Sequence, residues 1–321
     1  MKPYLSIVIP VYNEAKNLQP LFSRLATTLD KLGKTYEIIF INDGSKDNSE
    51  VILEDLYRLY LDKVRIITFS RNFGQHMAIM AGFESSQGEI IVTLDADLQN
   101  PPEEIPKLLE LIDKGHDLVS GIRLYERKDS WFRRNISIII NKIRALTTHI
   151  DMTDHGCMLR AYNRSIIDLI VAHDESSIFI PALAYSHATN PAEIKVDHEA
   201  RVVGKSKYSL YGLIRLNFDL MTGYSLVPLQ IFTIVGFSIA FLSILFVIFL
   251  FIRRLIIGPE VQGVFTLFAI AFFLIGVVLI GLGIMGEYVG RIYKEVQHRP
   301  RFSIKKVLGV QLDEKDTHTW H

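Results

Sequence analysis

Short apolar runs alternate with amphipathic stretches along the N-terminal part of the chain. The apolar runs predict strands at Leu5–Val11, Tyr36–Asn42, Val64–Phe69, Glu89–Leu94 and Asp117–Gly121. The stretches between them predict helices at Ala15–Lys31, Lys46–Tyr60, Gln75–Ser85 and from Pro101-Pro102 through Lys114. Strands that alternate with helices are typical of a doubly wound, mostly parallel sheet. The sequence therefore predicts an α/β fold for this part.

Two long uncharged stretches follow, Ile231–Ile252 and Val264–Met285, and each is long enough to cross a bilayer. They account for the positive mean hydropathy of the chain, +0.23. Several basic residues follow the second stretch: Arg291, Lys294, Arg299, Arg301, Lys305 and Lys306. Because positive charge gathers on the cytoplasmic side of membrane proteins, we expect a multi-pass protein with both ends in the cytoplasm.

Two further segments are amphipathic, Ser130–Leu146 and Tyr208–Met221. A basic amphipathic helix is typical of a membrane surface, although a helix packed on a domain core has the same pattern. The expected organisation is a cytosolic catalytic domain (1–200), a basic loop with an interface helix (201–228), two transmembrane helices (229–286) and a cytosolic tail (287–321). The N-terminal apolar run is too short for a signal peptide.

Charge and cysteine content exclude several classes of function. The 321-residue chain carries 35 basic and 35 acidic residues, so its overall charge favours no nucleic-acid partner. Its single cysteine, Cys157, excludes an intrachain disulfide and a zinc site built from cysteines.

The apolar run Ile90–Leu94 ends in two aspartates, Asp95 and Asp97. In an extended segment, residues i and i+2 point to the same side, so the two carboxylates repel unless a cation lies between them. Mg²⁺ or Mn²⁺ takes oxygen ligands of this kind and bridges to a substrate phosphate. The alternative is a pair of solvated loop aspartates.

Polar clusters also follow the other predicted strands. They are Tyr12-Asn13-Glu14, Asn42-Asp43-Gly44-Ser45, Ser70-Arg71-Asn72 and Asp95–Gln99. Open α/β sheets bind their ligands outside the carboxyl ends of the strands. We therefore expect these clusters to form one ligand site.

Several motifs carry a resemblance to a known family. They are Pro10-Val11-Tyr12-Asn13-Glu14, Asn42-Asp43-Gly44-Ser45, Arg71-Asn72-Phe73-Gly74, Asp95-Ala96-Asp97-Leu98-Gln99, Asp154 with Arg160, Arg201 with Gly204–Tyr208, and Gly286–Tyr293. This set resembles glycosyltransferase family 2, in particular its branch of polyprenyl-phosphate glycosyltransferases. Within that branch the chain looks most like the transferases of 4-deoxy-4-formamido-L-arabinose in lipid A modification.

The resemblance implies a GT-A fold and an inverting reaction at the cytoplasmic face of the bacterial inner membrane. A sugar would pass from a UDP-sugar to undecaprenyl phosphate with Mg²⁺ or Mn²⁺ as cofactor. The implied sugar is 4-deoxy-4-formamido-L-arabinose, with glucose, galactose or an N-acetylhexosamine as alternatives. The bilayer and a homo-oligomer are further expected partners.

The resemblance also implies roles for individual residues. The expected donor site consists of Pro10, Val11, Tyr12, Glu14, Asp43, Asp95, Ala96 and Gln99, with Asp43 on the uracil and Glu14 on the ribose. Asp95 and Asp97 would hold the metal. The expected catalytic residues are Asp97, Asp154 and Arg160, and the expected phosphate ligands are Arg201, Lys205 and Lys207.

Each role has an alternative. Asp43 can cap the next helix, and Tyr12 can simply pack. Arg160 can form a structural ion pair with Asp154, and the basic loop around Lys205 can bind anionic lipid. Because a polyprenyl phosphate is already ionised near neutral pH, we expect Asp154 to orient a substrate rather than to remove a proton.

Three other functions compete with sugar transfer to a lipid phosphate. A processive polysaccharide synthase carries a Gln-x-x-Arg-Trp motif, and neither Trp131 nor Trp320 lies in that context. A phosphohydrolase would use Asp95 as nucleophile, but such motifs usually lie on the first strand. A membrane scaffold that binds a nucleotide sugar without turnover would not need the intact set of acids.

Overall fold

A computed structural model of the chain describes residues 2–123, 153–154, 156–172, 179–199, 227–258, 264–297 and 300–309. The chain divides into two compact units, which are described separately. The first contains the sheet and its helices, including residues 300–309. The second contains two long helices. The predicted amphipathic segments Ser130–Leu146 and Tyr208–Met221 lie outside the described residues.

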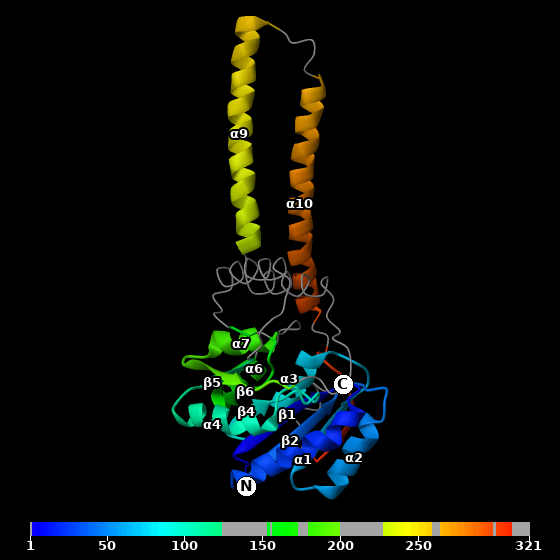
Figure 1. The fold of residues 1–321 in the computed structure, drawn as a ribbon. Coiled ribbons are helices and arrows are strands. Elements are labelled where there is room, and N and C mark those ends of the chain that lie inside the picture. The colour runs from blue at the N-terminus through cyan, green and yellow to red at the C-terminus, as the bar shows by residue number, and fades with distance from the viewer. Residues whose placement is uncertain are drawn as a thin grey trace. The chain divides into compact units, whose positions relative to one another are not determined.

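A mixed eight-stranded sheet forms the first unit (Figure 1). Its strands are β1 (Leu5–Val11), β2 (Tyr36–Asn42), β3 (Val64–Phe69), β4 (Ile90–Thr93), β5 (Leu118–Arg123), β6 (Arg160–Asn163), β7 (Pro191–Val196) and β8 (Ile304–Leu308). The strand order is β7-β5-β6-β4-β1-β2-β3-β8. The central strands β4, β1, β2 and β3 are parallel, whereas β6 and β8 pair antiparallel with their neighbours.

Helices cover both faces of this sheet, as the alternation of strands and helices predicts. They are α1 (Ala15–Lys31), α2 (Ser49–Leu59), α3 (Gln75–Ser85), α4 (Ile105–Asp113) after the short helix η1 (Pro102–Glu104), α6 (Arg164–Ala172) and α7 (Ile180–His187). Along β1, Ile7 and Ile9 join the hydrophobic cluster of α1, α2 and α4, and Val8 joins that of α3, α6 and α7. This alternation is what a strand buried on both faces requires.

Strand β8 was not predicted, because residues 287–321 were expected to form a tail. It pairs antiparallel with β3 and covers that edge of the sheet. Lys305 and Lys306 form ion pairs with Glu50 and Glu54 of α2, at 3.0 and 2.8 Å. The buried ring of Phe302 stacks on Phe69 of β3 with the ring centroids 4.9 Å apart. The segment from Phe302 to Leu308 is therefore part of the sheet and its core.

Helices α9 (Val227–Ile257) and α10 (Val264–Val296) belong to the second unit (Figure 1). A side chain at Gly281 of α10 would collide with the ring of Phe232 of α9, so the two helices approach closely there. Within the described part of the chain, one segment, Ile270–Gly290, is long and apolar enough to cross a membrane.

Candidate active site

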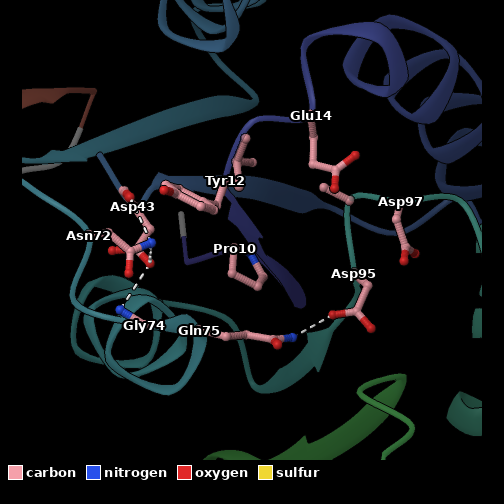
Figure 2. Close-up of a pocket in the computed structure, with 11 residues that line it drawn as sticks. Pro10, Tyr12, Glu14, Asp43, Asn72, Gly74, Gln75, Asp95 and Asp97 are labelled. Atoms are coloured by element: carbon pink, nitrogen blue, oxygen red, sulfur yellow. Dashed lines mark hydrogen bonds between the residues drawn. The ribbon is translucent and has the colours of Figure 1, made fainter. Parts of the chain in front are cut away.

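Polar residues that follow the parallel strands line a cavity of about 360 Å³ at one edge of the sheet (Figure 2). Its lining residues are Pro10, Val11, Tyr12, Glu14, Asp43, Asn72, Gly74, Gln75, Asp95, Ala96 and Asp97. The strands β4, β1, β2 and β3 are adjacent, so their carboxyl ends bring these residues together. The predicted clusters therefore do form one site.

Asp43 lies at one end of the cavity and is held by the segment that leads into α3. Its carboxylate accepts hydrogen bonds from the Asn72 side chain at 2.8 Å and from the backbone N–H groups of Phe73 and Gly74 at 2.7 and 3.0 Å. Burial raises the pKa of Asp43, and the two backbone N–H groups oppose that rise. The carboxylate thus faces α3 and does not cap the following helix α2.

The turn after β2 depends on Gly44. Its φ of +63° is in the left-handed region, and a Cβ there would lie 2.4 Å from the backbone carbon of Arg71. Only glycine fits so close an approach of two backbones. Gly44 therefore brings the turn that carries Asp43 into contact with the loop after β3.

The turn after β1 is locked to the turn after β2. Asn13 has φ +58°, a conformation that asparagine tolerates better than most residues. Its backbone N–H donates to the Ser45 hydroxyl at 3.0 Å, and its side-chain oxygen accepts from the Lys46 N–H at 2.7 Å. These bonds fix the turn that carries Tyr12 and Glu14, and both residues line the cavity.

Asp95 lies at the other end of the cavity, directly after β4 and Leu94. Its Oδ1 accepts a hydrogen bond of 2.6 Å from the Gln75 side chain. Burial and the neighbouring Asp97 carboxylate raise the pKa of Asp95 to about 7, although Arg123 and Gln75 oppose the rise. A cation between the two carboxylates would remove the repulsion that causes part of this shift.

Asp97 is held by a strained turn. Its Oδ1 accepts from the backbone N–H of Gln99 at 3.1 Å, and the intervening Leu98 has φ +62°. A left-handed conformation costs a residue other than glycine about 1–2 kcal/mol. The side chain of Leu98 is buried in the main hydrophobic cluster, and this burial offsets that cost. The strain therefore lies at the acidic end of the cavity, as is common for ligand sites.

The loop that follows Asp97 is tied to two other segments. The Gln99 carbonyl accepts from the backbone N–H of Glu199 at 2.8 Å. Arg24 of α1 forms ion pairs with Glu103 and Glu199, at 2.9 and 2.8 Å. These contacts hold the residues after β7 beside the residues after β4.

Asp95 and Asp97 suit an ion such as Mg²⁺ that protein side chains coordinate only in part. Among the described residues no group of three or more histidine, cysteine, aspartate or glutamate side chains gathers as a metal site. Two carboxylates leave the remaining positions to phosphate and water oxygens, which is how Mg²⁺ is usually bound. The donor set therefore fits a metal that is shared with a phosphorylated ligand.

Asp154 is paired with Arg123 at the end of β5. The guanidinium donates two hydrogen bonds of 2.8 Å to the two carboxylate oxygens, and Gly156 N–H donates a third of 2.9 Å. Burial alone would raise the pKa of Asp154, but these donors outweigh it and bring the pKa to about 2. Asp154 is therefore ionised at neutral pH and engaged on both oxygens, which does not suit a general base.

Comparison with known proteins identifies the family. The family description "Glycosyl transferase family 2" matches residues 6–171. A relative from Pseudomonas fluorescens (strain SBW25), named undecaprenyl-phosphate 4-deoxy-4-formamido-L-arabinose transferase, is 49% identical over 317 residues, 97% of this chain and 93% of its own. The chain belongs to glycosyl transferase family 2. The resemblance seen in the sequence is thereby confirmed, and the protein is a glycosyltransferase.

Two further similarities accompany this result. A relative of the same name from Proteus mirabilis (strain HI4320) is 46% identical over 314 residues, 97% of this chain and 96% of its own. A solved structure, glucosyl-3-phosphoglycerate synthase from Mycobacterium tuberculosis in complex with Mn²⁺ and UDP-glucose, has a TM-score of 0.47 and 16% identity. It covers 68% of this chain and 77% of that one.

Arg160 of this glycosyltransferase lies within the sheet and does not line the cavity. The residue is fully buried in β6, where its guanidinium donates to the Ser120 hydroxyl at 2.8 Å and to the carbonyls of Cys157 and Asp154 at 2.9 Å each. Arg160 thus braces the loop that carries Asp154. The expected ion pair with the Asp154 carboxylate is made by Arg123.

The cavity of the glycosyltransferase includes Asn72, which was expected there as part of a strand-end cluster, and two residues that were given no role in the site, Gly74 and Gln75. Their signal in the sequence was their position just after a predicted strand. Gln99, expected in the donor site, contributes its backbone to the loop and does not line the cavity. Arg201, Lys205 and Lys207 lie outside the described residues.

Proposed function

We propose that this glycosyltransferase transfers a sugar from a UDP-sugar to undecaprenyl phosphate with inversion, and that the sugar is 4-deoxy-4-formamido-L-arabinose. One observation carries the proposal. Relatives with that name are 46–49% identical across more than nine-tenths of both chains. The cavity supports the proposal, because Asp43 would bind the nucleobase at one end and Asp95 and Asp97 would share a metal with the diphosphate at the other. Glucose, galactose and N-acetylhexosamine are the alternative sugars.

The nucleoside of the donor would occupy the end of the cavity near Asp43. An ionised carboxylate offers about four acceptor positions, and three are used by the segment 72–74. One position is left for the uracil N–H. Pro10, Val11 and Tyr12 would line the base, Glu14 would accept from a ribose hydroxyl, and Ala96 would contact the donor beside Asp95.

The diphosphate would lie at the other end, beside Asp95 and Asp97. These two carboxylates would hold Mg²⁺ or Mn²⁺, and the bound ion would neutralise the charge that develops on the departing UDP. The raised pKa of Asp95 supports this assignment, because it reflects an acid that is buried and crowded by a second carboxylate.

The acceptor phosphate would attack the sugar without help from a base. A phosphate monoester is ionised at neutral pH, so its oxygen is already a nucleophile, and catalysis consists of positioning and charge stabilisation. The lowered pKa of Asp154 and its pairing with Arg123 support an orienting role for this residue. Arg201, Lys205 and Lys207 would supply further positive charge for the phosphates.

A lipid acceptor also explains why the second unit contains two long apolar helices. We propose that α9 and α10 cross the bacterial inner membrane and that the catalytic domain, of the GT-A type, lies in the cytoplasm. Their 31 and 33 residues exceed the roughly 20 that a spanning helix needs. Residues 201–228 would form the loop and interface helix, and 287–321 would return the chain to the sheet through β8. A homo-oligomer formed through the spans belongs to the same proposal.

Transfer from a panel of radiolabelled UDP-sugars to undecaprenyl phosphate, in detergent with Mg²⁺ or Mn²⁺, tests the proposal. Label is expected in the lipid extract with UDP-4-deoxy-4-formamido-L-arabinose and not with the other donors. Asp97→Asn should abolish it. Label from another donor would change the assigned sugar. UDP binding without lipid label from any donor would overturn the proposed reaction.

A further inference from the structure

Four consecutive residues, from the loop after β3 to the first residue of α3, bridge the two ends of the cavity. Asn72, Phe73 and Gly74 donate to Asp43, and the next residue, Gln75, donates to Asp95. Figure 2 shows this segment along one side of the cavity, with the Gln75 side chain extended toward Asp95. The nucleoside end and the acidic end of the site are therefore held by one short stretch of chain.

The contact between Gln75 and Asp95 has the geometry of an orienting hydrogen bond. The Gln75 amide nitrogen lies 2.6 Å from Oδ1 of Asp95, and both side chains are partly buried. A carboxylate with one oxygen fixed in this way cannot rotate freely, so its second oxygen keeps one direction. Because an amide carries no charge, it orients the carboxylate without competing with a cation for it.

The backbone places Gln75 where this contact can form. Gly74 has φ +101°, in the region that favours glycine, and Gln75 is the first residue of α3 after that turn. The first turn of α3 is further held through Asp43, which accepts the Gly74 N–H. Gln75 therefore reaches Asp95 from a rigid helix end and not from a free loop.

We propose that Gln75 is a positioning residue that sets the orientation of Asp95 for binding of the divalent metal. This inference rests on the proposed function, in which Asp95 and Asp97 share a metal with the diphosphate of the donor. Residues that orient metal ligands typically contribute 10- to 100-fold to metal affinity. Gln75 then governs how tightly the metal binds, whereas Asp43 governs the nucleoside.

The test replaces the amide and measures metal binding directly. The full-length protein in detergent is titrated with Mn²⁺ in the presence of UDP, and free Mn²⁺ is followed by electron paramagnetic resonance. Gln75→Leu removes the donor at similar size, and Gln75→Met serves as a second variant that keeps the unbranched chain. Gln19→Leu, the same change on the exposed face of α1, is the matched control.

Gln75→Leu and Gln75→Met are expected to weaken Mn²⁺ binding roughly 10- to 100-fold. Gln19→Leu should bind Mn²⁺ as the wild type does. UDP binding without metal should not change, and the melting temperature should stay within the range of the control. In the transfer assay the Mn²⁺ concentration for half-maximal activity should rise while kcat at saturating Mn²⁺ stays the same.

Two results would overturn the inference. Wild-type Mn²⁺ affinity in both Gln75 variants would show that the amide does not orient Asp95. An equal loss of metal-free UDP binding and of Mn²⁺ binding would show that Gln75 merely maintains the fold of the pocket. Both presuppose a wild type that transfers sugar and binds Mn²⁺. A wild type that transfers no sugar, or does not bind Mn²⁺, would instead refute the proposed function or its metal.

Discussion

Asp95 and Asp154 are two carboxylates near Arg123 whose pKa values shift in opposite directions. Burial and the adjacent Asp97 raise the pKa of Asp95 from 3.8 to about 7. Burial also opposes ionisation of Asp154, but the paired guanidinium of Arg123 outweighs it and brings that pKa to about 2. Burial opposes ionisation of both acids, and the nearest charge adds to that effect at Asp95, where it is negative, and outweighs it at Asp154, where it is positive. These directions agree with the proposed roles, which are metal binding for Asp95 and substrate orientation for Asp154.

These shifts predict how the stability of the metal-free protein changes with pH. Between about pH 4 and 7, folded Asp95 retains a proton that the unfolded chain has lost, so the free energy of unfolding falls as pH rises through this window. Asp154 acts in a different window: its stabilisation is complete above about pH 4 and is lost as pH falls toward 2. Of these two acids, only Asp95 therefore contributes to the slope near neutral pH.

Asp95→Asn should remove that contribution. With a chelator present, the melting temperature of the wild type should fall more steeply between pH 5 and pH 7.5 than that of the variant. Thermal unfolding followed by circular dichroism measures both slopes under the same conditions, and the other titrating groups cancel in the comparison. Parallel slopes would contradict a strongly raised pKa at Asp95.

Substitution of Gly44 by alanine should destabilise the fold more than the same substitution at Gly33, which serves as the matched control. Both have nearly the same left-handed backbone, φ +63° and +64°, but only Gly44 would direct a Cβ into neighbouring backbone. Gly33→Ala should cost about 1 kcal/mol of stability. Gly44→Ala should cost roughly 2–4 kcal/mol, because the chain at Arg71 must also shift.

Thermal unfolding and UDP titration of the two glycine variants check this prediction. UDP binding should be weakened only in Gly44→Ala, since that turn carries Asp43. Equal losses of stability in the two variants would show that the backbone approach at Arg71 is not tight.

Among the secondary-structure elements, strand β8 completes a sheet whose other strands lie far earlier in the chain. Its partner β3 lies more than two hundred positions earlier, yet ion pairs to α2 and the stacked ring of Phe302 hold it. Phe302 contacts Phe69, and Phe69 contacts Phe73, whose N–H donates to Asp43. Phe302 thus supports the loop that forms the Asp43 end of the cavity.

Phe302→Ala should therefore destabilise the catalytic unit strongly. Loss of a buried phenylalanine costs about 3–5 kcal/mol, which corresponds to a melting temperature lower by roughly 6 °C or more. Lys305→Ala, which removes an exposed ion pair from the same strand, should cost under about 1 kcal/mol. Similar small effects of both substitutions in thermal unfolding would show that β8 does not pack as described.

Several elements could be predicted from the sequence because they bury a continuous apolar run. Leu5–Val11, Tyr36–Asn42 and Val64–Phe69 were expected at these bounds, since each run ends at a polar cluster. Helix α2 begins at Ser49 and not at Lys46, because Asp47 accepts from the Ser49 N–H and delays the first turn. Strand β8 is only five residues long and holds two adjacent lysines, Lys305 and Lys306, so it lacks the alternation that predicts a strand.

The acids of the candidate site could be predicted from the same apolar runs. Asp43, Asp95 and Asp97 follow apolar strands, so their convergence depends only on the strands being parallel and adjacent. The contact of Gln75 with Asp95 and the pairing of Arg123 with Asp154 were not predicted, because they join separate strand ends, which no local pattern encodes. For the same reason the sequence did not distinguish Arg160 from Arg123 as the partner of Asp154.

At the scale of the whole molecule, the chain combines a glycosyltransferase unit with a pair of long apolar helices. A nucleotide sugar is soluble in water, whereas undecaprenyl phosphate keeps its tail in lipid and its phosphate at headgroup level. An enzyme that joins them needs a polar cavity and a membrane anchor in one chain. The apolar helices α9 and α10 therefore support the proposed acceptor as much as the cavity supports the proposed donor.

In the proposed reaction a lipid phosphate attacks the donor sugar directly. A decisive experiment incubates the purified protein with UDP-4-deoxy-4-formamido-L-arabinose, Mn²⁺ and either undecaprenyl phosphate or undecaprenol, and quantifies UDP and the lipid product by mass spectrometry. Equal amounts of UDP and sugar-linked lipid are expected with undecaprenyl phosphate, and neither product above background with undecaprenol. Transfer to undecaprenol, or UDP release without a lipid product, would refute direct attack by the lipid phosphate.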